Sequence, residues 1–178
     1  MLFIISLIMK KIIITGVSGY IGSCLYFYLK KKYKVIGIDK KNSKYIKVIN
    51  VNLLNENKIN KILNKEKPDL IVHLAAQSLV DETINKKKYY LNNVIATKNL
   101  LYCLKKNNIK NLVFSSTAAI YKYKNYPLNE KSPLQPISTY AKTKYECEKL
   151  IKNSGINSII LRFFNVCSSM RVKNNIIG

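Results

Sequence analysis

A short glycine-rich turn constrains the fold of this chain more than any other sequence feature. Residues 15–22 read T-G-V-S-G-Y-I-G, so glycines stand at positions 16, 19 and 22. An apolar run of strand type, 12–15, precedes the turn, and a stretch with apolar residues at helical spacing, 21–32, follows it. Glycines at this spacing allow a tight turn and let backbone amides approach a pyrophosphate, while the helix N-terminus adds positive potential. In this strand–turn–helix context the motif predicts a dinucleotide-binding unit.

The rest of the chain repeats the alternation of short apolar runs and amphipathic stretches. We expect further strands at 34–38, 47–51, 70–73, 111–115 and 158–162, and helices around 59–63, 81–106 (irregular near Lys88) and 138–152. This rhythm is typical of a parallel sheet, and no internal repeat or linker divides it. The sequence therefore predicts an α/β fold with a doubly wound parallel sheet of the Rossmann type. We expect one domain at 10–178, preceded by an N-terminal extension at 1–9 that reflects an upstream start codon or, alternatively, a short signal or anchor segment.

Asp39 closes the second expected strand, where a carboxylate has a specific use in such a domain. It accepts hydrogen bonds from the hydroxyls of an adenosine ribose and repels a 2′-phosphate, which favours NAD over NADP. Lys40 and Lys41 weaken this preference because neighbouring cations tolerate the phosphate. The alternative is a plain glycine turn with an unrelated surface carboxylate.

Tyr140 and Lys144 lie four residues apart on an expected helix, so both side chains share one face. Tyrosine, with an ordinary pKa near 10, is a poor base at neutral pH. A nearby ammonium, helped by a positive nicotinamide ring, favours the phenolate. In so lysine-rich a chain an exposed helical pair explains this spacing equally well. The hydroxyls at 115–117 favour catalysis, because they end a strand where open α/β sheets bind ligands.

These elements follow one another as in the extended short-chain dehydrogenase/reductase family, which the chain resembles from Lys10 almost to its end. The similar segments are T-G-V-S-G-Y-I-G-S, Asp39, H-L-A-A, Asn92-Asn93, F-S-S-T-A-A-I-Y, Y-A-K-T-K and L-R-F-F-N. Within the family, Q-S-L-V-D-E, Y-Y-L-N-N-V and S-S-T-A-A-I-Y resemble UDP-glucose 4-epimerases most. Nucleotide-sugar 4,6-dehydratases usually carry Asp-Glu where this chain has Ala118 and Ala119, so the acid–base pair for dehydration is missing.

The resemblance implies NAD-dependent epimerisation of a UDP-sugar at C4, by transient oxidation to a 4-keto sugar that interconverts UDP-glucose and UDP-galactose. Two alternatives stay open: another nucleotide-sugar dehydratase or reductase of the family, and a truncated NAD-binding remnant without activity. The implied catalytic residues are Tyr140, Lys144 and Thr117. The implied cofactor contacts are Gly16, Gly19, Tyr20, Ile21, Gly22, Asp39, Asn52, Leu53, Leu74, Ala75, Ala76, Gln77, Ser78, Asn93, Tyr140, Lys144 and Phe164. The implied contacts to the sugar nucleotide are Thr117, Tyr140 and Asn165.

The resemblance also has departures and consequences for assembly. Asn52 stands where the family usually has Asp, so the expected contact near the adenine lacks a charge. The family's chains continue well beyond the position of Gly178, so we expect the substrate domain to be largely missing. The family often dimerises through two long helices, here 81–106 and 138–152, which implies a possible homodimer.

The formal net charge of +22 is the least typical property of the chain. Its lysines are spread along the sequence, and Asn, Ile and Tyr, which share A- or T-rich codons, are also frequent. We therefore expect coding bias and no specific nucleic-acid partner, since no nucleic-acid-binding signature accompanies the charge.

Residues 1–9 are too short to span a bilayer, and we expect a cytoplasmic protein without membrane contact. The four cysteines form no C-x-x-C pair, so we expect reduced thiols and no metal site. We expect His73 to be a packed, structural residue.

Overall fold

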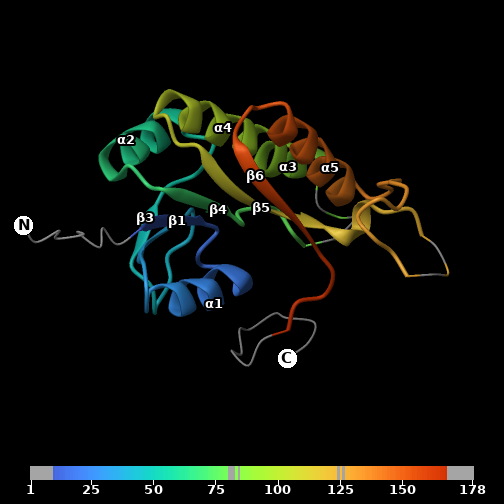
Figure 1. The fold of residues 1–178 in the computed structure, drawn as a ribbon, viewed down its shortest axis with the longest axis horizontal. Coiled ribbons are helices and arrows are strands. Elements are labelled where there is room, and N and C mark those ends of the chain that lie inside the picture. Colours follow the sequence, from blue (N-terminus) through green and yellow to red (C-terminus); the bar gives the residue numbers. More distant parts are fainter. Residues whose placement is uncertain (1–9, 80–82, 84, 124, 126, 168–178) are drawn as a thin grey trace, which may run out of the picture.

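The computed structural model describes residues 10–79, 83, 85–123, 125 and 127–167, and these form a parallel sheet in the order β3-β2-β1-β4-β5-β6 (Figure 1). The chain leaves the centre of the sheet in one direction through β2 and in the other through β4, so the strand order reverses next to β1. This confirms the doubly wound, Rossmann-type sheet that the sequence predicts. The strands are β1 (Lys11–Thr15), β2 (Lys34–Asp39), β3 (Val48–Asn50), β4 (Leu70–His73), β5 (Asn111–Thr117) and β6 (Asn157–Phe163).

Helices cover both faces of the sheet, as Figure 1 shows. On one face, α1 (Tyr20–Leu29) packs against β1 and β2. On the other lie α2 (Glu56–Glu66), α3 (Lys86–Tyr89), the π-helix η1 (Tyr90–Ile95), α4 (Ala96–Lys106) and α5 (Thr139–Lys152). Successive side chains of a strand point to opposite faces. Accordingly Ile12 and Ile14 belong to the core beneath α1, whereas Ile13 belongs to the core beneath α2, α4 and α5.

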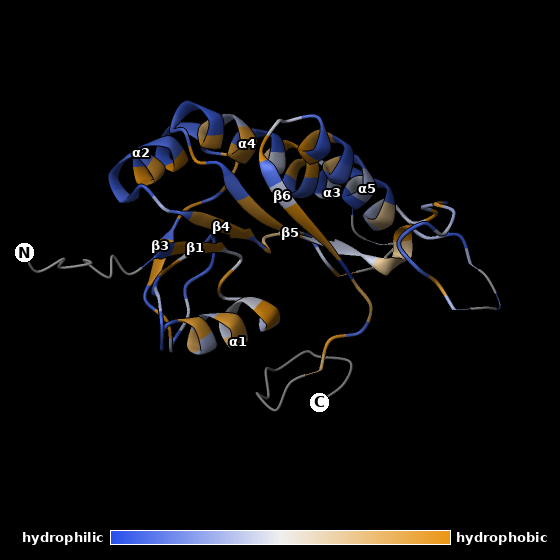
Figure 2. Ribbon diagram, viewed as in Figure 1, coloured by the Kyte–Doolittle hydropathy of each residue, from blue (hydrophilic) through white to orange (hydrophobic). Residues whose placement is uncertain are grey.

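Hydrophobic residues concentrate on the strands and on the inner sides of the helices (Figure 2). β1 is buried on both faces, as expected of a central parallel strand. β6 ends the strand order, and on it Ile159 is 60% and Leu161 38% exposed, so the sheet keeps an apolar outer strand. None of the helices in the described part of the chain is long and apolar enough to cross a membrane. All four cysteines are free, as expected.

The bounds of the elements agree with the sequence prediction to within one residue except in five places. α1 ends at Leu29, three residues earlier than expected, and α2 extends three residues beyond the expected 59–63 at each end. The third strand is shorter than expected, and β5 continues to Thr117 before a 3₁₀ turn, η2 (Ala118–Ile120). The expected helix at 81–106 begins at Lys86 among the described residues, and position 81 lies outside them. The irregularity expected near Lys88 is confirmed as η1. The proposed extension at 1–9 and the end at Gly178 also lie outside the described residues.

His73 joins the centre of the sheet to α4. Its Nδ1 lies 2.7 Å from Thr15 Oγ1 and its Nε2 lies 3.1 Å from Thr97 Oγ1. Burial lowers the pKa of His73 to about 3, and the charge of Lys144 acts in the same direction. The expectation that His73 is packed and structural is therefore confirmed.

We expect the free energy of unfolding to fall as the pH drops from about 6.5 towards 3, partly through His73. The unfolded chain protonates His73 near its ordinary pKa of 6.5, whereas the folded imidazole stays neutral down to about pH 3. The unfolded state therefore binds more protons in this window, at a cost of at most about 1.4 kcal/mol per pH unit. Urea unfolding of the wild type and His73→Asn from pH 4 to 7 measures this, and the wild type's advantage should shrink on acidification. An advantage independent of pH would contradict the assignment.

Candidate active site

A cavity of about 730 Å³ lies at the carboxyl ends of β1, β2, β4 and β5, where the strand order reverses. Open parallel sheets bind their ligands at this position. The structure gathers all but two of the residues implied by the sequence around this cavity. Those that border it are Gly16, Gly19, Tyr20, Ile21, Gly22, Asp39, Asn52, Leu53, Leu74, Ala75, Ala76, Gln77, Ser78, Thr117, Tyr140, Phe164 and Asn165. Asn93 and Lys144 are buried behind its wall.

The glycine turn packs closely against the backbone that follows β4. Gly16 has a φ of +75°, and a Cβ atom on it would lie 2.6 Å from the amide nitrogen of Ala75. A Cβ atom on Gly22 would lie 2.3 Å from the carbonyl oxygen of Gly16. Gly19 is the N-cap of α1, so no cap side chain stands between the first helical amides and the cavity. The turn therefore forms a cradle of backbone that fits a pyrophosphate at a helix N-terminus.

Gly16→Ala should destabilise the fold more than Gly155→Ala, which serves as a matched control. Both glycines are left-handed, with φ of +75° and +73°, but a Cβ on Gly155 meets nothing within 4 Å. Both variants therefore carry the same backbone strain, and only Gly16→Ala adds a clash, costing about 1–3 kcal/mol more. Denaturant unfolding of both variants measures the difference. Equal losses would show that the turn is not tightly packed.

The Asp39 carboxylate connects the glycine turn to the loop after β2. Its Oδ2 accepts a hydrogen bond from the Ser18 amide and its Oδ1 accepts one from the Lys41 amide, each at 3.0 Å. Each carboxylate oxygen has a further lone pair for a ligand hydroxyl. Nearby, Asn52 Oδ1 accepts from the Leu54 amide at 3.0 Å, so this side chain is partly used in a local turn.

Three residues that sequence reasoning missed border the same end of the cavity: Lys88, Asn92 and Ala96. They lie four residues apart on α3, η1 and α4, and the Lys40 ammonium donates to Asn92 Oδ1 at 3.0 Å. Their spacing within one expected helical region was the available signal, because such residues share a helix face. The sequence did not predict which face of this helical region turns toward the cavity, because the π-helix η1 changes the direction of the side chains.

Asn93 joins the cavity wall to the helix that carries Tyr140. Its Oδ1 accepts from the Gln77 amide at 2.7 Å, and its Nδ2 donates to Thr143 Oγ1 at 2.9 Å. The side chain thus fixes the loop after β4 against α5 from behind the wall.

Tyr140 and Lys144 stand on α5, which Ser138 caps by accepting from the Ala141 amide at 3.1 Å. Tyr140 borders the cavity beside Thr117. Burial raises the pKa of Tyr140, and a hydrogen bond with the Thr117 side chain acts in the opposite direction. Among the chain's own groups, desolvation of the phenolate outweighs those that favour it. The expectation that the Lys144 ammonium and a positive nicotinamide ring together favour the phenolate stays a prediction.

Lys144 is 1% exposed, and its ammonium lies 4.2 Å from the centre of the Phe114 ring. Burial lowers the pKa of Lys144 to about 8, although Cys147 and Glu148 act to raise it. At neutral pH the lysine is thus mainly a charged group held away from water. Such a charge acts strongly on its surroundings, and it also costs stability.

Lys144→Met should stabilise the fold at pH 7. The ordinary pKa of 10.5 falls to about 8 on folding, so burying the charged form costs up to about 3 kcal/mol below pH 8. Between pH 8 and 10.5 the unfolded state binds more protons, so the stability of the wild type rises and the gain from the variant shrinks. Guanidinium unfolding at pH 7 and pH 10 measures both effects. A wild type more stable than the variant at pH 7 would contradict this account.

The fold and the site together define a dinucleotide-binding α/β protein with a Tyr–Lys pair beside its cavity. The chain belongs to the NAD dependent epimerase/dehydratase family, whose model matches residues 12–177. This confirms the resemblance inferred from the sequence.

Several known proteins of similar sequence or structure are UDP-sugar 4-epimerases, and the dTDP-D-glucose 4,6-dehydratase of Dictyostelium discoideum is also similar, at 31% identity over 96% of this chain and 47% of that protein. The UDP-glucose 4-epimerase of Lactobacillus helveticus is 36% identical over 173 residues, which cover 89% of this chain and 52% of that protein. The UDP-Glc/GlcNAc 4-epimerase of Campylobacter jejuni is 33% identical, with a TM-score of 0.80 over 90% of this chain and 56% of that one. The UDP-glucose 4-epimerase of Brucella ovis, solved in complex with NAD, is 26% identical, with a TM-score of 0.83 over 88% and 52%. The chain thus spans about half the length of these relatives.

Proposed function

We propose that this chain is the NAD-binding part of an enzyme that epimerises a UDP-sugar at C4, interconverting UDP-glucose and UDP-galactose. The observation that carries this proposal is the meeting of Tyr140 and Thr117 at a cavity that also holds the glycine cradle. A proton-transferring phenol and a dinucleotide site thus share one space. The similarity to epimerases over most of the chain supports the same reaction.

The cavity fits NAD, and different residues of the chain bind different parts of the cofactor. The glycine cradle faces the pyrophosphate, and the Asp39 carboxylate, with lone pairs to spare, binds the adenosine ribose. Asn52 and Leu53 lie toward the adenine, the loop from Leu74 to Ser78 borders the middle of the cofactor, and Phe164 and Lys144 lie toward its nicotinamide half. When bound, NAD would supply reversible hydride transfer at C4 of the sugar.

The protein's own contribution is to bind the sugar and to move one proton. Thr117 holds the C4 oxygen toward Tyr140, and Asn165 contacts the sugar nucleotide. The Tyr140 phenolate accepts the C4 hydroxyl proton and returns it after the sugar has turned over in the site. Because burial raises the pKa of Tyr140, the positive charges of Lys144 and of the oxidised cofactor are needed to favour the phenolate.

The residues after Thr117 favour epimerisation over dehydration. Ala118 and Ala119 open η2, and neither side chain can transfer a proton. The alternatives are a nucleotide-sugar dehydratase of the same family, a nucleotide-sugar reductase of that family, and a truncated remnant that binds NAD without turnover. Product analysis with several sugar nucleotides separates the first two from epimerisation.

We also propose how the chain is organised and where it acts. Residues 10–178 form the NAD-binding domain, residues 1–9 an extension, and most contacts to the UDP moiety come from a substrate domain that these residues largely lack. We propose a cytoplasmic protein that takes a UDP-sugar, without a specific nucleic-acid or membrane partner. A homodimer through the helical regions 81–106 and 138–152 is supported by the packing of α3, η1 and α4 beside α5, with Tyr90 44% and Tyr102 51% exposed.

Tyr140→Phe should abolish turnover while leaving NAD binding intact. Loss of the phenolic proton acceptor costs about 100-fold or more in kcat. Calorimetric titration with NAD and conversion of UDP-galactose to UDP-glucose measure the two properties. Tyr145→Phe, on the same helix but not among the residues that border the cavity, is the matched control and should behave as the wild type.

The outcomes separate the alternatives. Saturable NAD binding with turnover that depends on Tyr140 supports the epimerase. NAD binding without turnover in the wild type supports the inactive remnant. A wild type that binds no NAD would overturn the proposed function.

A further inference from the structure

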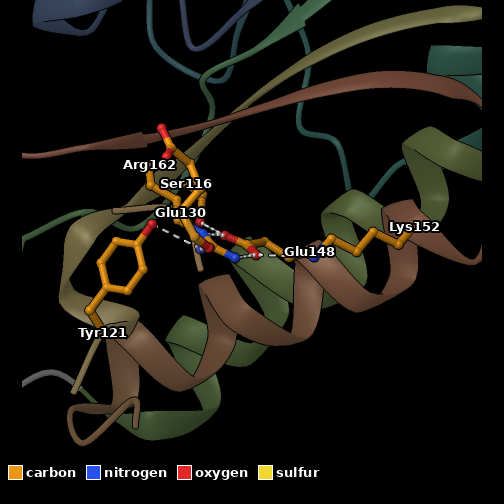
Figure 3. Close-up of polar contacts among 6 residues, drawn as sticks. All are labelled: Ser116, Tyr121, Glu130, Glu148, Lys152 and Arg162. Atoms are coloured by element: carbon orange, nitrogen blue, oxygen red, sulfur yellow. Dashed lines mark hydrogen bonds and ion pairs between the residues drawn. The ribbon is translucent and has the colours of Figure 1, made fainter. Parts of the chain in front are cut away.

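Glu148 places a fully buried carboxylate on α5, one helical turn beyond Lys144 and two turns beyond Tyr140. Its Oε1 accepts from Ser116 Oγ at 2.6 Å and from Arg162 Nε at 3.0 Å, and its Oε2 accepts from Arg162 Nη2 at 2.8 Å (Figure 3). This is a bidentate ion pair with an additional hydroxyl donor. The three side chains come from β5, β6 and α5, so the cluster joins the catalytic helix to two strands.

Arg162 extends the cluster to the segment after η2. Its Nη1 donates to the Tyr121 hydroxyl at 3.0 Å and to the Glu130 carbonyl at 3.4 Å. The guanidinium carbon also lies 5.0 Å from the centre of the Tyr121 ring, as a cation–π contact. Figure 3 shows Tyr121 and Glu148 on opposite sides of Arg162. Arg162 thereby also holds residues that follow Thr117 in the sequence, Tyr121 and Glu130, against β6.

The position of Ser116 links this cluster to the proposed chemistry. Ser116 directly precedes Thr117 at the end of β5, and Thr117 borders the cavity together with Tyr140. On α5 the residues at 140, 144 and 148 share one helix face. The hydrogen bond from Ser116 to Glu148 therefore fixes α5 relative to the end of β5. It thereby also fixes the position of Tyr140 on α5 relative to Thr117 on β5.

The charge of Glu148 acts on Lys144 from the same helix. Burial alone would raise the pKa of Glu148, but the hydrogen bonds from Arg162 and Ser116 and the charge of Arg162 hold it below its usual range. The groups that face Lys144 are His73 on β4, Phe114 on β5, and Cys147 and Glu148 on α5. At neutral pH His73 and Cys147 are uncharged, because burial lowers the pKa of the first and raises that of the second. Glu148 is the one negative charge in this set.

We infer that Glu148 is a positioning residue for the Tyr140–Lys144 pair, which it serves by holding β5 against α5 through Ser116 and by placing a negative charge beside Lys144. The inference rests on the proposed function and deepens it. A purely structural ion pair is the competing explanation. Buried ion pairs contribute little net stability compared with apolar side chains, so stability alone gives a weak reason for this arrangement.

Two substitutions separate the two parts of this role. Glu148→Gln removes the charge but keeps an oxygen that can accept from Ser116. Ser116→Ala removes the bond to β5 but keeps the charge. Lys152→Gln is the matched control, because it removes the exposed ammonium 4.0 Å from Glu148 Oε2 and leaves the carboxylate paired with Arg162 beside Lys144. Thermal melts establish that each variant is folded, and Glu148→Gln with Arg162→Gln in one chain replaces the single variant if the unpaired guanidinium prevents folding.

The first measurement is the pKa of Lys144. It is obtained by a pH titration monitored by NMR, with chains labelled with ¹³C at the lysine ε carbon. Burial lowers the pKa of Lys144 to about 8, below the ordinary lysine value of about 10.4, and Lys144→Met identifies its signal. Glu148→Gln should lower the pKa of Lys144 by about 0.5 unit or more, and neither Lys152→Gln nor Ser116→Ala should lower it. This readout requires neither cofactor nor turnover. An unchanged pKa in folded Glu148→Gln would overturn the inference.

The second measurement is turnover, with UDP-galactose as the substrate and saturating NAD. Ser116→Ala should lower kcat about tenfold or more, with little change in KM or NAD affinity, because small misplacements of reacting groups act mainly on the chemical step. An unchanged kcat in the folded variant contradicts the positioning of Thr117 through Ser116. A wild type without turnover counts against the proposed function instead, and the titration of Lys144 then decides the inference.

Discussion

The site depends on how closely two backbone segments approach each other, the turn at Gly16 and the chain at Ala75. Contacts within 3 Å of where a side chain would begin leave no room for anything but glycine at the turn. This approach is possible because β1 and β4 are neighbouring parallel strands whose ends are level, with Thr15 opposite His73. The imidazole of His73, close to the Thr15 hydroxyl, then holds these ends together. The cavity exists because the two loops leave the sheet from this point in opposite directions.

A second constraint operates on α5, where the fold keeps an ammonium and a carboxylate out of water. Lys144 costs stability at neutral pH, whereas the ionised form of Glu148 is held by three hydrogen bonds from Ser116 and Arg162. Both charges lie on the same side of the helix as Tyr140. Burial opposes ionisation of the Tyr140 phenol. A positive charge held out of water beside it would favour the phenolate, which gives this arrangement a physical reason.

The sequence was sufficient to predict most of the fold and the outline of the site. Apolar alternation located the strands, and the glycine turn with Asp39 located the cavity, because both signals depend on spacing along the chain. Burial could not be read in this way. In the sequence, Asn93 stands next to Asn92 and Lys144 stands four residues from Tyr140, and both of these neighbours border the cavity. The packing of η1 and α5 nevertheless places Asn93 and Lys144 behind the cavity wall. The same limit explains Tyr140, whose pKa is governed by desolvation and not by the nearest lysine along the helix.

The outer strand of the sheet has a consequence for the behaviour of this chain in solution. β6 presents apolar side chains at the end of the strand order, and an uncovered strand of this kind is a template for pairing with other molecules. The net charge of +22 opposes such pairing by mutual repulsion. Because this repulsion is screened within about 10 Å at 0.1 M salt, ionic strength governs the balance between dispersed and associated molecules. The lysine-rich surface thus works as a colloidal stabiliser for an α/β domain in which β6 is the outermost strand among the described residues.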